Sequence, residues 1–577
     1  MDQRSPAATT GPATPYGAPV PAPVFPRLAL ALSALLALRL LALALNRADL
    51  FFDEAQYWAW AQAPAFGYYS KPPLIAWLIA ASTSLCGNSE FCIRLPSPLI
   101  HTATALTIAA LGARLYDART GALAALAFAL LPGVSLSAGI ISTDVPLLLC
   151  WALALLGFAA LFETKAWWPA LLLSAALAAG LNAKYAMAWF ILCAAIYLIA
   201  TPARRTILRD PRLWAALALG IAGIVPNLIW NQAHSFATFA HTADNAKWEG
   251  GLLHPAKALE FFASQFGVFG PFYFAGLLLI TYRGLKLRFF TLPLVGRAGV
   301  GVGLSNVGLR DPHPNPPRVA AEPRSARTGE GKDKNSTRET AGNGSNSDPF
   351  ARHSEPDRLL MAFCLPLILI ITGQAFLSRA HPNWAAVAYV SGTLLVVATL
   401  VRELAWGWLK ASYALHAALL AALIAATSLA GALKLPLKPD PLARTLGWRA
   451  LAEATRAELD AARARGTPYA AVMTDKRAVT AELLYYMRAE PTPVLAFRAG
   501  PRPHDHFELS RPYTPASGEP VLLVSLAGVT DDTANAAVPS AASAFAQAHV
   551  VAGRDIPAGK NATRRVTFLA LSGYKGP

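Results

Sequence analysis

Charged residues are scarce in this chain. Asp, Glu, Lys and Arg make up only 15% of its 577 residues, whereas ordinary soluble domains contain roughly a quarter of such residues. Hydrophobic residues make up 54% of the chain, and the mean hydropathy is +0.38. This composition excludes an assembly of soluble domains and indicates an integral membrane protein.

Cysteine is also scarce, and the five cysteines show no paired C-x-x-C spacing. The sequence therefore gives no sign of a disulfide scaffold or a zinc site. We expect no cofactor, and a divalent metal is the alternative that the sequence leaves open. Fifty Lys and Arg against 34 Asp and Glu give a net charge of +16. No basic motif with interleaved aromatic residues accompanies this charge, so we expect a lipid bilayer as partner and no nucleic acid.

Long apolar segments are abundant, and each is long enough, at ~1.5 Å rise per residue, to cross a ~30 Å hydrocarbon core. Eleven are found: 28–46, 95–113, 121–143, 145–162, 166–183, 185–203, 213–233, 261–282, 359–378, 382–401 and 411–433. The first resembles a secretory signal at Ala42-Leu43-Ala44, but the many later segments favour a membrane anchor. We therefore predict a mostly α, polytopic membrane protein.

Basic residues define the orientation of these spans. Lys and Arg gather in alternate loops, at 114–119, 204–212, 283–288 and 402–410, and such residues concentrate on the cytoplasmic side. Residues 1–27 are then a disordered cytoplasmic tail, and the Gly- and Pro-rich segment 289–357 is a disordered cytoplasmic insertion. With an odd number of spans, the C-terminal region lies on the extracytoplasmic face of the membrane, which is the periplasmic face if the membrane is a bacterial inner membrane.

The composition becomes that of a soluble domain after residue 433. Short β-prone runs at 469–473, 493–497, 521–525 and 565–571 alternate with helix-like stretches at 476–488 and 537–549. This alternation predicts a small periplasmic α/β domain over 434–577, beside a transmembrane domain over 28–433.

Charged residues on the outer side are few, and the first outer loop, 47–94, contains an adjacent pair, Asp53 and Glu54. Aromatic residues of the kind found at membrane interfaces surround this pair. A carboxylate held there can act as a general base that deprotonates an acceptor hydroxyl. The alternative is that the two acids only end the first span.

Lys71 follows in the same loop, between aromatic residues and a Pro-Pro pair, before a short apolar run at 74–85 that predicts an interfacial helix. An ammonium group at the headgroup level can bind a phosphate, although an isolated interfacial lysine more often only extends to water.

Asp144 and Lys184 lie at hinges between spans and taken singly indicate turns. Arg39 lies inside the first span, where it needs water, a carboxylate or a carbonyl as partner.

Two smaller features complete this region. Cys86 and Cys92 fall on the oxidising side of the predicted topology, where they form either a disulfide across a short loop or two free thiols. The histidines between residues 234 and 254 match no metal-binding template, so we expect them to be loop residues.

These motifs resemble the GT-C superfamily of polyprenyl-phosphate-dependent membrane glycosyltransferases. The likeness is to family 39, of the dolichyl-phosphate-mannose protein mannosyltransferase type, and to bacterial lipid A aminoarabinose transferases. Asp53-Glu54 is similar to the acidic motif of the family, and Lys71 to a lysine before proline in the same loop. Looser matches are Ser142-Thr143-Asp144, Gly180 to Tyr185, and His381-Pro382-Asn383-Trp384.

The resemblance implies an inverting transfer of a sugar from a polyprenyl-phosphate donor to an envelope glycolipid, glycan or protein. It implies Asp53 as general base, Glu54 as a second candidate or orienting partner, and Lys71 as the donor-phosphate clamp. Other residues are expected to line the site: Tyr57, Tyr69, Asp144, Lys184, His381 and Asn383. A transporter, or a polysaccharide polymerase or ligase, is the rival class, but a transporter would carry charges near the membrane midplane.

Overall fold

The computed structural model describes residues 24–246, 253–290, 355–433, 442–526, 540–560 and 562–576. Internal contacts divide the chain into one unit of Met1–Ile280 with Ser354–Pro577 and a second of Thr281–His353. Most of the predicted tail and insertion lies outside the described residues. The tail prediction is too long by four residues, because the first helix begins at Val24, and the insertion prediction overlaps two helices that reach Phe290 and begin at Glu355.

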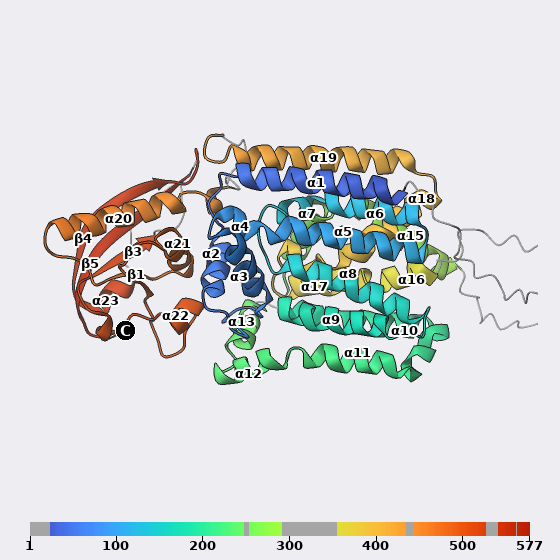
Figure 1. The fold of residues 1–577 in the computed structure, drawn as a ribbon, viewed down its shortest axis with the longest axis horizontal. Helices are drawn as coiled ribbons and strands as arrows, with labels where there is room; N and C mark the ends of the chain where they lie inside the picture. The colour runs from blue at the N-terminus through green and yellow to red at the C-terminus, as the bar shows by residue number, and fades with distance from the viewer. Residues whose placement is uncertain are drawn as a thin grey trace, which may run out of the picture. The chain divides into compact units, whose positions relative to one another are not determined.

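Helices form most of the described residues that precede residue 434 (Figure 1). They are α1 (Val24–Leu45), α2 (Phe52–Ala61), α3 (Leu74–Cys86), α4 (Glu90–Arg94), α5 (Pro96–Leu115), α6 (Ala118–Leu130), α7 (Pro132–Ser137), α8 (Asp144–Leu161), α9 (Trp168–Ala183), η1 (Tyr185–Ala188), α10 (Trp189–Ala200), η2 (Pro202–Arg209), α11 (Pro211–Ala222), α12 (Val225–Ala233), α13 (Ala237–Ala246), α14 (Pro255–Val268), α15 (Pro271–Phe290), α16 (Glu355–Ala362), α17 (Leu365–Leu377), η3 (Pro382–Ala385), α18 (Ala388–Arg402) and α19 (Trp406–Ser428).

The chain crosses the membrane several times. Six helical segments of the described residues are long and apolar enough to span a bilayer, or seven if α14 and α15, which meet at 118°, form one broken span. Shorter apolar helices occupy the remaining predicted spans, and α3 matches the predicted short helix after Lys71. The protein is thus a multi-pass membrane protein, and the count of eleven spans stays a prediction.

Small residues let the central helices approach closely. A Cβ added to Gly112 of α5 would lie 2.5 Å from the Cα of Gly121 of α6, so only glycine fits this crossing. In the bundle, α1 and α19 lie side by side along one flank, and α9 and α11 lie along the opposite flank (Figure 1).

The C-terminal region is a five-stranded sheet with strand order β2-β1-β3-β5-β4. Its strands are β1 (Ala471–Thr474), β2 (Val494–Ala496), β3 (Val521–Leu526), β4 (Phe545–Pro557) and β5 (Thr563–Tyr574). Strand β1 pairs in parallel with β2 and β3, whereas β5 pairs antiparallel with β3 and β4. The helices of this region are η4 (Ala443–Thr445), α20 (Trp448–Ala464), α21 (Arg477–Tyr486), α22 (His506–Ser510), η5 (Pro515–Ser517) and α23 (Ser540–Ser543).

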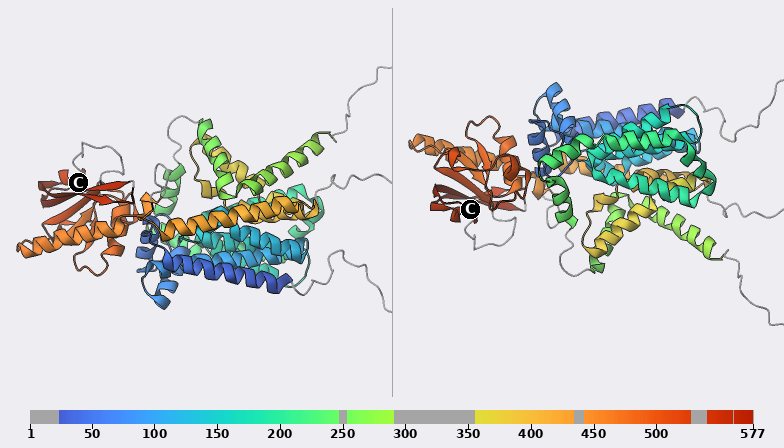
Figure 2. Two further views of the ribbon diagram at one scale, coloured as in Figure 1. Left: turned by 90° about the horizontal axis from the view of Figure 1, so that it is seen from above. Right: turned by 90° about the horizontal axis from the view of Figure 1, so that it is seen from below.

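Helices α20 and α21 pack against one face of this sheet (Figure 2). Alternate strand residues such as Val472, Leu522 and Phe568 point toward them, and their neighbours Met473 and Leu523 belong to a separate core on the other face. The alternation follows from the two-residue repeat of a strand.

The predicted helix at 537–549 is wrong. Residues 540–543 form the one turn of α23, and the chain then enters β4, which pairs with β5 from Phe545 to Pro557. The alanine-rich composition favours a helix locally, but the hairpin partner decides the structure.

Candidate active site

The two predicted acids lie in the first turn of α2. The backbone N–H groups at a helix N-terminus favour negative charge, which suits Asp53 and Glu54 there. The N–H of Phe51 donates a hydrogen bond to Oε2 of Glu54 at 2.9 Å, so Glu54 also caps its own helix.

Glu54 is fully buried and bound on all sides. Its carboxylate forms a forked pair with Arg94, in which Nε lies 3.0 Å from Oε1 and Nη2 lies 2.8 Å from Oε2. The N–H of Ile141 donates to Oε1 at 2.9 Å, and Arg94 donates further to the carbonyl groups of Ala48 and Asp49. Glu54 therefore joins three segments and fixes the start of α2.

Asp53 points instead toward the C-terminal domain. Its Oδ1 lies 2.8 Å from Nη1 of Arg477 on α21, and the same nitrogen lies 2.8 Å from Oε1 of Gln56. Both charged side chains are 36% exposed, and the guanidinium group also lies over the ring of Phe52 at 4.9 Å. Asp53 is thus held in place but still accessible, as a general base must be.

The loop that carries Lys71 is tied to α12 and α13. Nδ2 of Asn227 donates to the carbonyl of Phe66 at 2.8 Å, and the Thr238 hydroxyl donates to the carbonyl of Tyr68 at 2.8 Å. A Cβ on Gly67 would lie 2.4 Å from the Trp230 ring, so this close approach requires glycine. These contacts position Lys71 beside α2.

Lys71 is half-buried, and its ammonium group has no hydrogen bond or ion pair in the part of the chain that the structure describes. Burial lowers the pKa of its ammonium group, and the charge of Lys184 lowers the pKa further, whereas Asp53 and Asp144 raise it. Because Asp53 is paired with Arg477 and Asp144 with Lys184, Lys71 carries the surplus positive charge of this cluster. An anion is the ligand that such a group favours.

Three of the predicted site residues, from three different segments, form one chain of contacts. Nζ of Lys184 lies 2.7 Å from Oδ1 of Asp144, and Nδ2 of Asn383 donates to Oδ2 of Asp144 at 2.6 Å. The N-terminus of α8, the C-terminus of α9 and η3 thereby meet beside Lys71.

The remaining predicted residues lie around this cluster. Burial raises the pKa of Tyr57, and the nearby charge of Asp53 adds to the shift. Tyr69 is buried and donates from its hydroxyl to the carbonyl of Pro503 at 2.9 Å. His381 is exposed beside Trp384, yet partial desolvation lowers its pKa, and the charges of Arg379, Arg444, Lys184 and Lys71 act in the same direction.

The first outer loop and the C-terminal domain are bound to each other. The Tyr486 hydroxyl lies 2.6 Å from Glu90 and accepts a bond from the N–H of Leu50 at 2.9 Å. Arg449 also pairs with Glu90, at 2.7 Å. Aromatic residues of α2 and apolar residues of α20 and α21 belong to one buried core.

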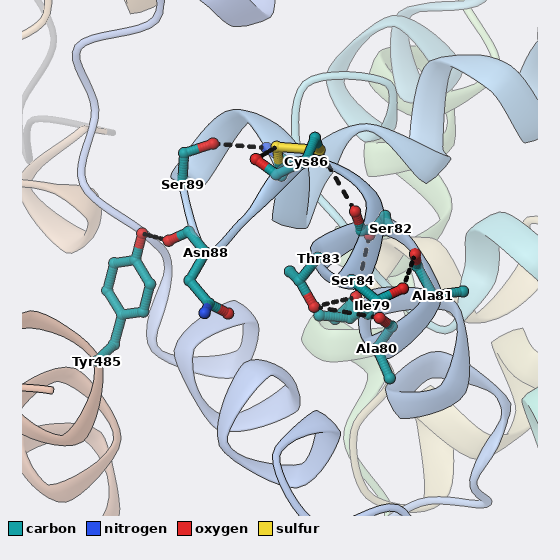
Figure 3. The surroundings of a disulfide bond; sticks show 11 residues. Ile79, Ala80, Ala81, Ser82, Thr83, Ser84, Cys86, Asn88, Ser89 and Tyr485 are labelled. Carbon is teal, nitrogen blue, oxygen red and sulfur yellow. Dashed lines mark hydrogen bonds between the residues drawn. A yellow bond between two sulfur atoms is a disulfide. The ribbon is translucent and has the colours of Figure 1, made fainter.

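A disulfide joins Cys86 and Cys92 in this loop, which confirms one of the two predicted states (Figure 3). It connects the end of α3 to α4. Next to it, the Tyr485 hydroxyl donates to the carbonyl of Asn88 at 2.9 Å, so the disulfide-closed turn is a contact point for the C-terminal domain (Figure 3).

Sequence reasoning missed Arg94 and Arg477, and it expected His241 to be a loop residue although His241 lies in α13. Arg94 precedes a span on the predicted outer side, where the charge rule used to orient the loops predicts few basic residues. This exception to the rule could have drawn attention to Arg94. His241 of α13 faces Tyr69, and burial together with the charge of Lys71 lowers its pKa to about 4. Arg477 has no local sequence feature that connects it to Asp53.

Among the described residues, no group of three or more His, Cys, Asp or Glu side chains is arranged to hold a metal ion.

Comparison with known proteins identifies the family. Residues 70–230 match the family described as dolichyl-phosphate-mannose-protein mannosyltransferase. The lipid A galacturonosyltransferase RgtD of Rhizobium johnstonii is 31% identical over 471 residues, which cover 82% of this chain and 84% of the relative. The chain belongs to this family of GT-C glycosyltransferases. The predicted resemblance is confirmed: this member is an enzyme that takes its sugar from a polyprenyl-phosphate-linked donor.

Two solved structures resemble the fold of this glycosyltransferase. They are crystal structures of ArnT from Cupriavidus metallidurans, one in the apo state and one bound to undecaprenyl phosphate. Each has a TM-score of 0.50 and 14% sequence identity, and each alignment covers 94% of this chain and 98% of the other.

Proposed function

We propose that this enzyme transfers a galacturonosyl unit from a polyprenyl phosphate to lipid A. The observation that carries the proposal is the position of Lys71, a cation without a counter-ion among the described residues, next to the Asp53 and Arg477 pair at the start of α2. A lipid phosphate supplies the missing negative charge, and a carboxylate at the same place can remove a proton. The RgtD relative supports the sugar and the acceptor, and the ArnT structure with undecaprenyl phosphate supports the class of donor lipid.

In the proposed reaction, Asp53 takes the proton of an acceptor hydroxyl as its oxygen attacks the anomeric carbon of the sugar. The bond between that carbon and the donor phosphate oxygen breaks, and its electron pair leaves with the polyprenyl phosphate. Attack opposite the leaving group inverts the anomeric configuration. General-base catalysis of this kind contributes roughly a hundred- to ten-thousand-fold in rate, and Lys71 stabilises the charge that develops on the phosphate.

Glu54 has the role of positioning Asp53. Its carboxylate already accepts bonds from Arg94, Phe51 and Ile141 and is 1% exposed, so it has no access to an acceptor. Tyr57, Tyr69, Asp144, Lys184, His381 and Asn383 line or support the site.

The proposed topology places the basic loops in the cytoplasm and the disulfide on the oxidising, periplasmic side. Residues 28–433 form the catalytic membrane domain with eleven spans, the N-terminus is cytoplasmic, and residues 434–577 form a domain on the periplasmic face of the inner membrane. The donor lipid and the acceptor both meet Asp53 on that face.

Replacing the base tests the proposal. In a strain that lacks the chromosomal copy, the wild-type enzyme should add a hexuronic acid to lipid A, visible by mass spectrometry, and Asp53→Asn should remove that mass increase while the protein still inserts. Asp460→Asn, at an exposed acid on α20, is the matched control and should keep full activity. An active Asp53→Asn enzyme would contradict the assignment of the base, and unmodified lipid A in the wild-type strain would contradict the acceptor.

A further inference from the structure

Arg39 is a charge inside the membrane that the proposed reaction does not use. It lies in α1 and is 3% exposed. One of its terminal nitrogens donates to the carbonyl of Ala129 in α6. Its Nε has no partner, and no carboxylate pairs with it among the described residues. A charge within the hydrocarbon region is costly and marks a functional site by default.

Arg39 lies in the wall of a cavity of about 220 Å³ in the outer half of the bundle. Most of the other walls are apolar, with Leu43 of α1, Leu136 of α7, and Leu423 and Ile424 of α19 among them. The further polar residues of the lining are Asn46, Arg94, Ser135, Thr427 and Thr445. Leu136 is 52% exposed, so this wall reaches the surface of the bundle that faces the lipid. The cavity has the chemistry of a mostly apolar slot for a hydrocarbon chain, with the guanidinium groups of Arg39 and Arg94 in its wall.

The upper end of the cavity reaches the active site. Asn46, Phe51 and Thr445 line it there, and Phe51 precedes Asp53 by two residues. Arg444 lies 4.9 Å from the ring of Phe51. The cavity therefore runs from the middle of the outer half of the membrane to the level of the base.

The proposed donor clamp lies away from this cavity. Neither Lys71 nor Lys184 lines it, and Lys184 follows α9, which lies on the flank of the bundle opposite to α1 and α19 (Figure 1). A polyprenyl phosphate bound at Lys71 would have its phosphate group outside this cavity.

We propose that the cavity beside Arg39 binds an acyl chain of the lipid acceptor, with the buried guanidinium group of Arg39 in the wall next to an ester oxygen of that chain. The inference rests on the proposed function, because it assigns the acceptor chain of the same reaction. A lipid acceptor must keep its chains in the membrane while its sugar hydroxyl reaches Asp53, and a slot that ends beside Phe51 allows both.

Filling the cavity tests this site. Leu423→Trp places a large ring in the slot, whereas Leu419→Trp, on the same helix but 43% exposed and outside the lining, is the control. We expect Leu423→Trp to raise KM for acylated lipid A about tenfold, which equals 1.4 kcal/mol. The KM for the donor, and the rate with a fully de-acylated lipid A backbone, should stay at the wild-type values. A raised donor KM, or no change in either KM, would overturn the proposal.

A second measurement does not depend on turnover. p-Benzoylphenylalanine at position 423, in the full-length protein in bacterial membranes, should form a light-induced adduct with the mass of lipid A, and the same group at position 419 should form mainly phospholipid adducts. An adduct with the polyprenyl donor or only with phospholipid at position 423 would overturn the site. If the wild-type enzyme does not modify lipid A, the proposed function fails on its own, and this adduct still reports the occupant of the cavity.

Discussion

At the residue scale, two carboxylates that are neighbours in sequence, Asp53 and Glu54, have different surroundings. Glu54 is buried in a network with Arg94, whereas Asp53 is one-third exposed and paired with Arg477. Adjacent residues of a helix point in different directions, about 100° apart, so one side chain faces the protein interior and the other faces the site. This difference follows from the helix and needs no difference in residue chemistry.

The surplus charge of Lys71 leads to a prediction for donor binding. Lys71→Ala should raise the Kd for polyprenyl phosphate about 10- to 100-fold, because a hydrogen bond to a charged group contributes roughly 1.5–3 kcal/mol. Burial and the charge of Lys184 lower the pKa of Lys71, so Lys71 loses its positive charge at a lower pH than an ordinary lysine does. As pH rises, the donor affinity of the wild-type enzyme should therefore begin to fall at a lower pH than at a site with an ordinary lysine. Lys257→Ala, at an exposed lysine on α14, should leave the Kd unchanged, and an equal Kd for both variants would contradict the clamp.

The sequence alone singled out Asp53, Lys71, Asp144 and Lys184, because charged groups at the ends of spans are rare, whereas Asn383 was singled out through the resemblance to the family. It could not identify Arg477, which lies more than 400 residues from Asp53 and enters the site only through the docking of α21 on α2. Long-range contacts of this kind depend on the packing of whole domains.

At the element scale, the contact between α2 and α21 contains a buried acid. Glu482 of α21 is fully buried, and neither oxygen of its carboxyl group has a hydrogen-bond partner among the described residues. Burial raises its pKa well above the usual value, and the charges of Asp49 and Glu54 add to this effect. The folded protein therefore holds a proton that the unfolded chain releases above pH ~4.5.

This proton makes stability fall as pH rises from the unfolded pKa toward the raised folded pKa. Glu482→Gln should remove that pH dependence and raise the melting temperature at pH 8 by several degrees, since each unit of pKa shift is about 1.4 kcal/mol. Thermal unfolding in detergent at pH 6 and pH 8 measures the effect. Glu453→Gln, at an exposed acid on α20, is the control, and identical pH dependence in both variants would show that Glu482 does not titrate in this range.

Helices and strands were predicted correctly from the sequence where one local property of the residues determines the secondary structure. The apolar segments became helices, and four β-prone runs became strands, because hydrophobicity and β-branched residues determine them locally. The prediction failed at β4, where Ala546, Ala548 and Ala552 favour a helix and only the pairing with β5 makes a strand. Helix α20 was also missed, although its amphipathic pattern is regular.

At the scale of the whole molecule, the first outer loop and the C-terminal domain share one core and must lie on the same side of the membrane. The proposed topology predicts that this side is the periplasm. Ala63→Cys in the first outer loop and Asp460→Cys in α20 should react with a membrane-impermeant maleimide in spheroplasts. Arg209→Cys, in the basic loop of η2, should react only after the membrane is opened.

The background of this labelling experiment is low, because Cys86 and Cys92 form a disulfide and Cys150, Cys193 and Cys364 are buried. Labelling of position 209 from outside, or protection of positions 63 and 460, would reverse the topology and remove both lipids from the proposed side of the reaction.

The pairing of Asp53 with Arg477 has a consequence for biosynthesis. The ribosome finishes all of the helical bundle before it makes α21, so a nascent or truncated polypeptide inserts with its base lacking the guanidinium that holds it. Such an incomplete product would occupy the bilayer and still be catalytically silent. If Asp53 is the base as proposed, the enzyme becomes competent only after α21 has been made and has packed against α2.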